Sequence, residues 1–166
     1  MIYFSLPNIL AHSPYEIFLS EGDFLFQTEK GIRYEISFNK EDIVFGECET
    51  YQLIIRKLNE THSPHDPKVR DTILAIVNEF FDSNQQILLY ICDTSDGKEN
   101  SRNRLFLHWF EKHAKENRFT IKTANAIVEN ERIYTTIIVE NSNPKLNAII
   151  KDFEDTAAML TNKPEH

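Results

Sequence analysis

Apolar and polar positions alternate along the N-terminal third of the chain, and this alternation predicts an antiparallel β meander. The clearest stretch has apolar residues at Ile32, Tyr34, Ile36 and Phe38, with a polar residue after each. Two shorter stretches precede it, separated by turn signals at residues 21–23 and 29–31. We therefore expect strands over three ranges: Tyr15–Ser20, Phe24–Thr28 and Ile32–Asn39. Residues 1–13 lack the alternation and predict an irregular arm.

The pattern after this meander is less regular. Residues 40–49 are acidic and predict no regular element. Tyr51–Leu58 fits a helical stripe as well as a strand, so its apolar spacing leaves both open. The β-branched pair Ile54 and Ile55, together with the preceding meander, favours a fourth strand.

Apolar residues take up a helical period after residue 66. Asp66 is a suitable N-cap and Pro67 a suitable first residue for a helix that runs to about Asp82. The continuous apolar run Ile87–Cys92 then predicts a central strand that is covered on both faces.

The rest of the chain predicts a helix, a hairpin and a last helix. A helix after Asn100 carries its apolar residues, including Trp109, along one side. Phe119–Val128 and Arg132–Glu140 predict a β-hairpin, and a helix starting near Asn143 ends before a frayed tail at residues 162–166. The order predicts an α+β fold, with an antiparallel meander followed by α-β-α-β-β-α, in one mixed sheet packed by helices. We expect one globular domain over residues 1–166.

Composition and charge narrow the classes of function. The chain has 166 residues, of which 41% are hydrophobic, and a formal net charge of -8. This negative charge disfavours nucleic acid and anionic membranes as partners. The opening residues show no signal peptide, and no apolar run approaches the roughly 20 residues that span a bilayer. With only two cysteines, we expect a cytoplasmic protein without disulfides.

The strongest candidate site follows the predicted central strand. Asp93, Asp96 and Glu99 precede Arg102 and Arg104, and the next helix begins there. The arginines and the helix N-terminus favour an anion such as a phosphate or a nucleotide. The acids could instead hold Mg²⁺ for phosphoryl transfer. The favoured interpretation is structural: a turn in which Asp93 pairs with Arg102 or Arg104.

A metal site is the second candidate. His62 and His65 lie three residues apart, and Cys48 or His12 could join them. A structural zinc site needs four ligands at characteristic spacing, which this chain lacks. Histidines in a proline-containing loop are usually solvated, so we expect neither a metal nor another cofactor.

A nucleophilic cysteine is the third candidate. Cys92 could use His108 or His113 as a base if a positive environment lowered its pKa. However, Cys92 continues an apolar strand, and the two histidines lie on different faces of the predicted helix. Packing in the core is therefore the simpler role, and no catalytic residue is assigned.

Several segments together resemble a small bacterial family of domains of unknown function. The similarity lies in Leu89–Gly97, Arg102–Phe106 and Trp109–Phe110, and extends to Val69–Ile73 and Phe80–Phe81. The resemblance implies a bacterial, single-domain protein without an established activity. It therefore transfers no catalytic residues.

Two hypotheses about function follow. The first is a non-enzymatic interaction domain that binds a protein partner or a second copy of itself, since no catalytic set is evident and the edge of the meander needs covering. The alternative is an enzyme or sensor of a small anionic ligand that uses Asp93, Asp96, Arg102 and Arg104.

Overall fold

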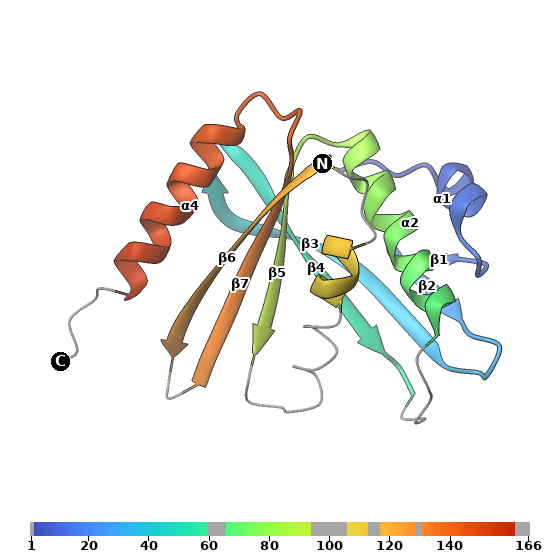
Figure 1. Ribbon diagram of the computed structural model, residues 1–166. Helices are drawn as coiled ribbons and strands as arrows, with labels where there is room; N and C mark the ends of the chain where they lie inside the picture. Colours follow the sequence, from blue (N-terminus) through green and yellow to red (C-terminus); the bar gives the residue numbers. More distant parts are fainter. Residues whose placement is uncertain (1, 60–65, 94–105, 113–116, 129–130, 162–166) are drawn as a thin grey trace. The chain divides into compact units, whose positions relative to one another are not determined.

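The computed structural model describes residues 2–59, 66–93, 106–112, 117–128 and 131–161. It confirms the predicted α+β fold with one mixed sheet, whose strands follow the order β1-β2-β3-β4-β5-β7-β6 (Figure 1). The chain divides into two compact units. Unit 1 comprises Met1–Asn39 and Leu53–Gln85, and unit 2 comprises Lys40–Gln52 and Gln86–His166. Among the described helices, none is long and apolar enough to cross a membrane.

The predicted meander is present as four consecutive strands. They are β1 (Phe18–Ser20), β2 (Asp23–Gln27), β3 (Arg33–Phe45) and β4 (Cys48–Lys57). Antiparallel pairing joins β1 to β2 and β2 to β3, and β4 is the next strand of the sheet. The ambiguous stretch after residue 50 is thus a strand, as favoured.

The acidic stretch at residues 40–49 was predicted to be irregular, and this prediction is wrong. Residues 40–45 complete β3 and residues 48–49 begin β4. The strands are joined by Gly46 and Glu47, with φ of 57° and 64°. Most side chains at residues 40–44 are exposed, so the acids Glu41 and Asp42 remain compatible with a strand.

Unit 1 contains two helices, α1 (Leu6–His12) and α2 (Pro67–Ser83). The α2 helix begins as predicted, because the Asp66 side chain accepts a hydrogen bond from Lys68 N at 2.9 Å. The α1 helix lies where an irregular arm was predicted. Ser5 caps it by accepting a hydrogen bond from Asn8 N at 3.3 Å, and a proline stands in its first turn.

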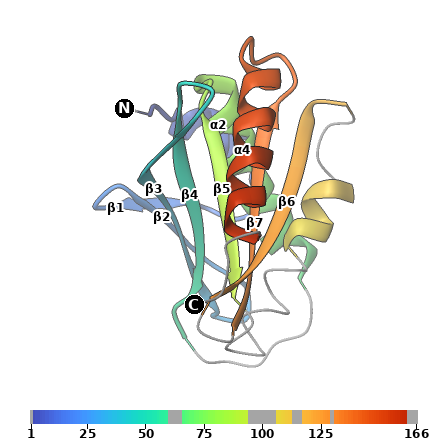
Figure 2. The same cartoon turned by 90° about the vertical axis from the view of Figure 1, so that its left-hand side faces the viewer.

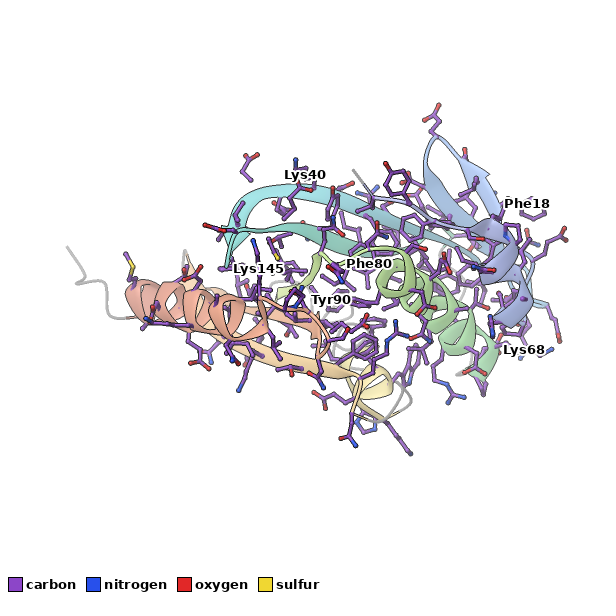
Figure 3. The ribbon with its side chains drawn as sticks, turned by 90° about the horizontal axis from the view of Figure 1, so that it is seen from above. Phe18, Lys40, Lys68, Phe80, Tyr90 and Lys145 are labelled. Carbon is purple, nitrogen blue, oxygen red and sulfur yellow. The ribbon has the colours of Figure 1, made fainter. Side chains whose placement is uncertain are left out.

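Aromatic side chains fill the core of unit 1. Phe80 of α2, labelled in Figure 3, is fully buried. It stacks on Phe38 of β3, with ring centroids 5.2 Å apart. Phe4 lies beside both rings and meets Phe24 edge-on at 4.9 Å. The stacking places α2 on the strand face that carries the even-numbered residues of β3.

Polar groups of α2 hold the N-terminal segment of unit 1 in place. The buried Glu79 carboxylate accepts hydrogen bonds from Ser5 N at 3.0 Å and from Ser83 Oγ at 2.5 Å. The Asn84 side chain accepts a hydrogen bond from Tyr3 N and donates one to Tyr3 O. Together with the packing of Phe4, these contacts hold the residues before α1 in place.

Unit 2 is built around β5 (Ile87–Asp93), which pairs in parallel with β4 and antiparallel with β7 (Glu131–Glu140). The antiparallel pair of β7 and β6 (Phe119–Val128) confirms the predicted hairpin. Helix α4 (Leu146–Thr161) covers one face of these strands (Figure 2). Helical residues 106–112 cover the other, through ring contact between Phe106 and Tyr90 at 4.8 Å.

Candidate functional site

The residues of the predicted anion or magnesium site lie mostly outside the described part of the chain. Asp96, Glu99, Arg102 and Arg104 all fall within the undescribed residues 94–105. The backbone of Asp93 ends β5 opposite Ile133. Since the position of the Asp93 side chain is not described either, this site stays a prediction.

The other predicted candidates are not brought together in the described residues. His62, His65, the Cys92 side chain and His113 lie outside them. Cys48 is a half-buried free thiol that packs against apolar side chains of unit 2. His12 contacts Asn8 O at 3.0 Å within α1, and His108 is exposed. Within the described ranges, no three His, Cys, Asp or Glu residues could hold a metal ion.

The first half of α4 is tightly packed on the sheet of unit 2. Ile149 and Phe153 are buried in an apolar cluster with Leu89 and Ile137. The ring of Phe153 meets that of Phe45 edge-on, with centroids 5.6 Å apart. Large side chains therefore fill the space between this half of the helix and the strands.

The turn between β3 and β4 makes polar contacts with the first half of α4 and with Lys145, which directly precedes this helix. Gly46 N donates a hydrogen bond to Asp152 Oδ2 at 2.6 Å, and Lys145 Nζ lies 3.3 Å from Glu47 Oε2. A Cβ atom on Gly46 would lie 2.7 Å from Ile149 N. Only glycine allows the backbone of the turn to approach the helix this closely.

The second half of α4 leaves an apolar cavity of about 200 Å³ above the strands. Thr156 and Ala157 form its roof, and they are smaller than the residues one to two turns earlier. The lining residues are Ile43, Phe45, Leu89, Ala124, Asn125, Thr135, Phe153, Thr156 and Ala157. None of them is titratable, so the described lining offers binding surface but no acid, base or thiolate.

One acidic residue, Glu41, lies on the β3 side of the cavity. Glu41 lies two residues before Ile43 and so on the same face of the strand. Asp155 is exposed and precedes Thr156 on α4. On the β6 side, Glu154 Oε1 lies 3.9 Å from Lys122 Nζ. Among the described residues neither Glu41 nor Asp155 has an ion-pair partner, so Glu41 contributes an uncompensated negative charge beside the β3 wall.

The cavity was not predicted from the sequence, because its wall comes from the stretch predicted to be irregular. Ile43 and Phe45 form that wall. A usable signal was present: an apolar run over Ile43–Phe45, followed by Gly46-Glu47 as a turn. A second signal was the step from large to small residues along the apolar face of the last helix.

Comparison with known proteins adds a family but no activity. A family model described as a family of unknown function (DUF6169) matches residues 65–155, which is more than half of the 166 residues. The predicted resemblance to a domain-of-unknown-function family is thereby confirmed. Searches of the curated proteins and of the solved structures found no match.

Proposed function

The chain belongs to DUF6169, a family of unknown function, and on that premise we propose that it is a non-enzymatic protein-interaction domain. The cavity under α4 takes one large apolar side chain of a partner protein. The observation that carries this proposal is the lining, which is apolar and lacks a titratable group. Deep apolar pockets that receive a single anchor residue are common centres of protein interfaces.

The size of the cavity fits such an anchor. An apolar cavity of about 150 Å³ is enough to bind benzene, and this one measures about 200 Å³. Burying a Leu or Phe side chain contributes about 1.5–3 kcal/mol. A stable complex needs more than this, so the anchor belongs to a segment that also contacts the rim.

The charge beside the cavity indicates which residues flank the apolar anchor in the partner segment. Glu41 lies on the strand face that forms the cavity wall, and the chain as a whole carries -8. A partner segment with Lys or Arg next to its apolar residue would be attracted to this surface. Acidic segments would be repelled, which gives selectivity among partners that share the same apolar residue.

A peptide library displayed on phage and selected against the full chain tests the proposal. We expect the selected peptides to carry a large apolar residue next to Lys or Arg. Ala157→Leu fills the cavity and should weaken their binding by about 10-fold to 100-fold in calorimetry. The matched control is Ala158→Leu, because Ala158 is the adjacent, exposed position on the same helix.

Two outcomes would overturn the proposal. One is a set of peptides whose affinity is the same for Ala157→Leu and Ala158→Leu. The other is a melting temperature that ATP with Mg²⁺ raises and that Arg104→Ala restores to its basal value, since this would favour the anion site. A complementary probe is benzene, which should raise the melting temperature of the unmodified chain but not of Ala157→Leu.

A further inference from the structure

The outer edge of β6 is a second surface of unit 2 with a definite geometry. β6 is the last strand in the sheet order, and it pairs only with β7 among the described strands (Figure 2). The other end of the sheet is β1, which has only three residues, whereas β6 has ten. A strand of this length presents a regular row of backbone groups along its outer edge.

The pairing with β7 determines which residues of β6 face outward. Asn141 N donates to Arg118 O at 2.8 Å, which makes this opposed pair a hydrogen-bonded one. Even-numbered residues of β6 therefore direct N–H and C=O toward β7. Thr123 and Thr136 form the alternate kind of pair, and their hydroxyl oxygens lie 2.9 Å apart. Odd-numbered residues such as Ile121, Thr123, Asn125 and Ile127 thus direct N–H and C=O away from β7.

The composition of β6 does not protect this edge against pairing. The strand contains no proline, no glycine and no acidic residue, and Lys122 is its one charge. Natural sheets usually protect long edges with prolines, bulges or several charges. The absence of acids matters in a chain of net charge -8, because another copy meets little like charge along this strand.

We propose that β6 pairs antiparallel with β6 of a second copy, about a two-fold axis at Thr123 or Ala124. In such a pair, the N–H and C=O groups that point away from β7 in one copy bond to the same groups in the other copy. Odd-numbered residues must therefore lie opposite odd-numbered residues. Centres at Thr123 and Ala124 both meet this condition near the middle of the strand. A centre at Lys122 would set two lysines opposite each other, which disfavours it.

With either centre, Lys122 lies opposite an alanine of the second copy and not opposite another lysine. With the axis at Thr123, Lys122 lies opposite Ala124 of the second copy, and with the axis at Ala124 it lies opposite Ala126. Each pairing sets the charge against a small side chain and leaves its contact with Glu154 in the same chain intact. The two-fold symmetry also makes the contact self-limiting, so it yields a dimer and not a filament.

Sedimentation of the full chain over a wide range of concentrations tests the proposal, with Thr123→Pro as the breaking variant. Proline removes an N–H that points away from β7, so the hairpin keeps its hydrogen bonds while the proposed dimer loses some. We expect a dimer for the unmodified chain and a dissociation constant raised about tenfold or more by Thr123→Pro. Thr123→Val loses the same hydroxyl but keeps the N–H, and should still dimerise.

Amide hydrogen exchange supplies a test that needs no variant. In the dimer, the amides of Ile121, Thr123 and Asn125 should become more protected as protein concentration rises, while even-numbered residues change little. A chain that stays monomeric at the highest concentration would overturn the proposal. So would a dimer in which these amides exchange at the same rate as in the monomer, because it would form elsewhere.

Discussion

Helices α2 and α4 lie against strands in their own units, yet they leave different interiors. In unit 1, Phe80 and Phe81 of α2 fill the space, and Phe80 stacks on Phe38. In unit 2, the first half of α4 carries large buried residues, and Thr156 and Ala157 in its second half roof a cavity of about 200 Å³. Side-chain volume at two positions thus distinguishes a filled core from one that contains a cavity.

The polar groups of the two units differ in a similar way. Unit 1 uses a buried carboxylate and a buried amide, Glu79 and Asn84, to hold its N-terminal segment. The cavity of unit 2 contains only Thr and Asn as polar residues. Unit 1 therefore uses buried polar groups to hold a segment in place, whereas the cavity of unit 2 is lined mainly by apolar side chains.

The largest expected effect is loss of the aromatic filling in unit 1. Phe80→Ala removes a fully buried ring and should lower the free energy of unfolding by about 3–5 kcal/mol. Denaturant unfolding measures it. The control is Phe18→Ala, because Phe18 is 57% exposed and its loss should change stability by about 0.5 kcal/mol or less. Equal losses for the two variants would contradict a filled core.

The next effect concerns the attachment of the β3–β4 turn to α4. Gly46→Ala should lower the free energy of unfolding by about 2 kcal/mol or more, because it adds a clash with Ile149 to the cost of a positive φ. Gly22 also has a positive φ but has no heavy atom within 4 Å of the added Cβ. Gly22→Ala should therefore show only the conformational cost, about 1 kcal/mol. A smaller loss for Gly46→Ala than for Gly22→Ala would argue against close packing of the turn.

A third variant makes unit 2 resemble unit 1. Ala157→Leu places a larger apolar side chain in the cavity and should raise the free energy of unfolding by about 1 kcal/mol. The same exchange at the exposed Ala158 should change it by about 0.5 kcal/mol or less. Thermal unfolding of both variants provides the comparison. A destabilised Ala157→Leu would mean that the roof cannot accept the added volume.

The last expected effect is a pH dependence that belongs to unit 1 and is confined to alkaline pH. Burial of the ring and the hydrogen bond from its hydroxyl to the Asp66 carboxylate raise the pKa of Tyr15 to about 12. The unfolded chain releases this proton near pH 10, so the stabilisation is complete below that pH. It is lost as the pH rises from about 10 to about 12. Lys68 of α2, labelled in Figure 3, lies over the same ring.

Tyr15→Phe isolates this dependence from other alkaline transitions. The variant should lose stability less steeply than the unmodified chain between pH 10 and pH 12. Denaturant midpoints measured through that range give the slopes. Parallel slopes for the two proteins would show that Tyr15 does not titrate differently in the folded state.

Local patterns predicted the elements whose own residues determine them. The alternation in β3, the cap and proline at the start of α2, and the apolar run of β5 all describe short stretches of sequence. The position of β7 between β5 and β6 could not be predicted, because it depends on pairing between distant strands. The same holds for α1, a short helix held by contacts with residues more than 70 positions away.

The cavity escaped prediction for a related reason. Its wall at Ile43 and Phe45 and its roof at Thr156 and Ala157 lie more than a hundred residues apart. Each segment carries a local signal, but neither signal alone predicts that the two segments enclose an empty volume. Asp93, Asp96, Arg102 and Arg104 could be proposed from local spacing, since acids and arginines are recognisable one by one. That site stays a prediction, and the melting temperature measured with ATP and Mg²⁺, with Arg104→Ala as the variant, tests it.

The half-buried Cys48 offers a way to measure how often α4 separates from the strands of unit 2. Its thiol packs against the apolar cluster that also holds Ile149 of α4, so a modifying reagent reaches it faster whenever the helix lifts. In a Cys92→Ser background it is the sole thiol of the chain. The labelling rate would then measure how often the helix leaves the sheet, and a peptide bound beneath α4 would slow the reaction without touching the sulfur.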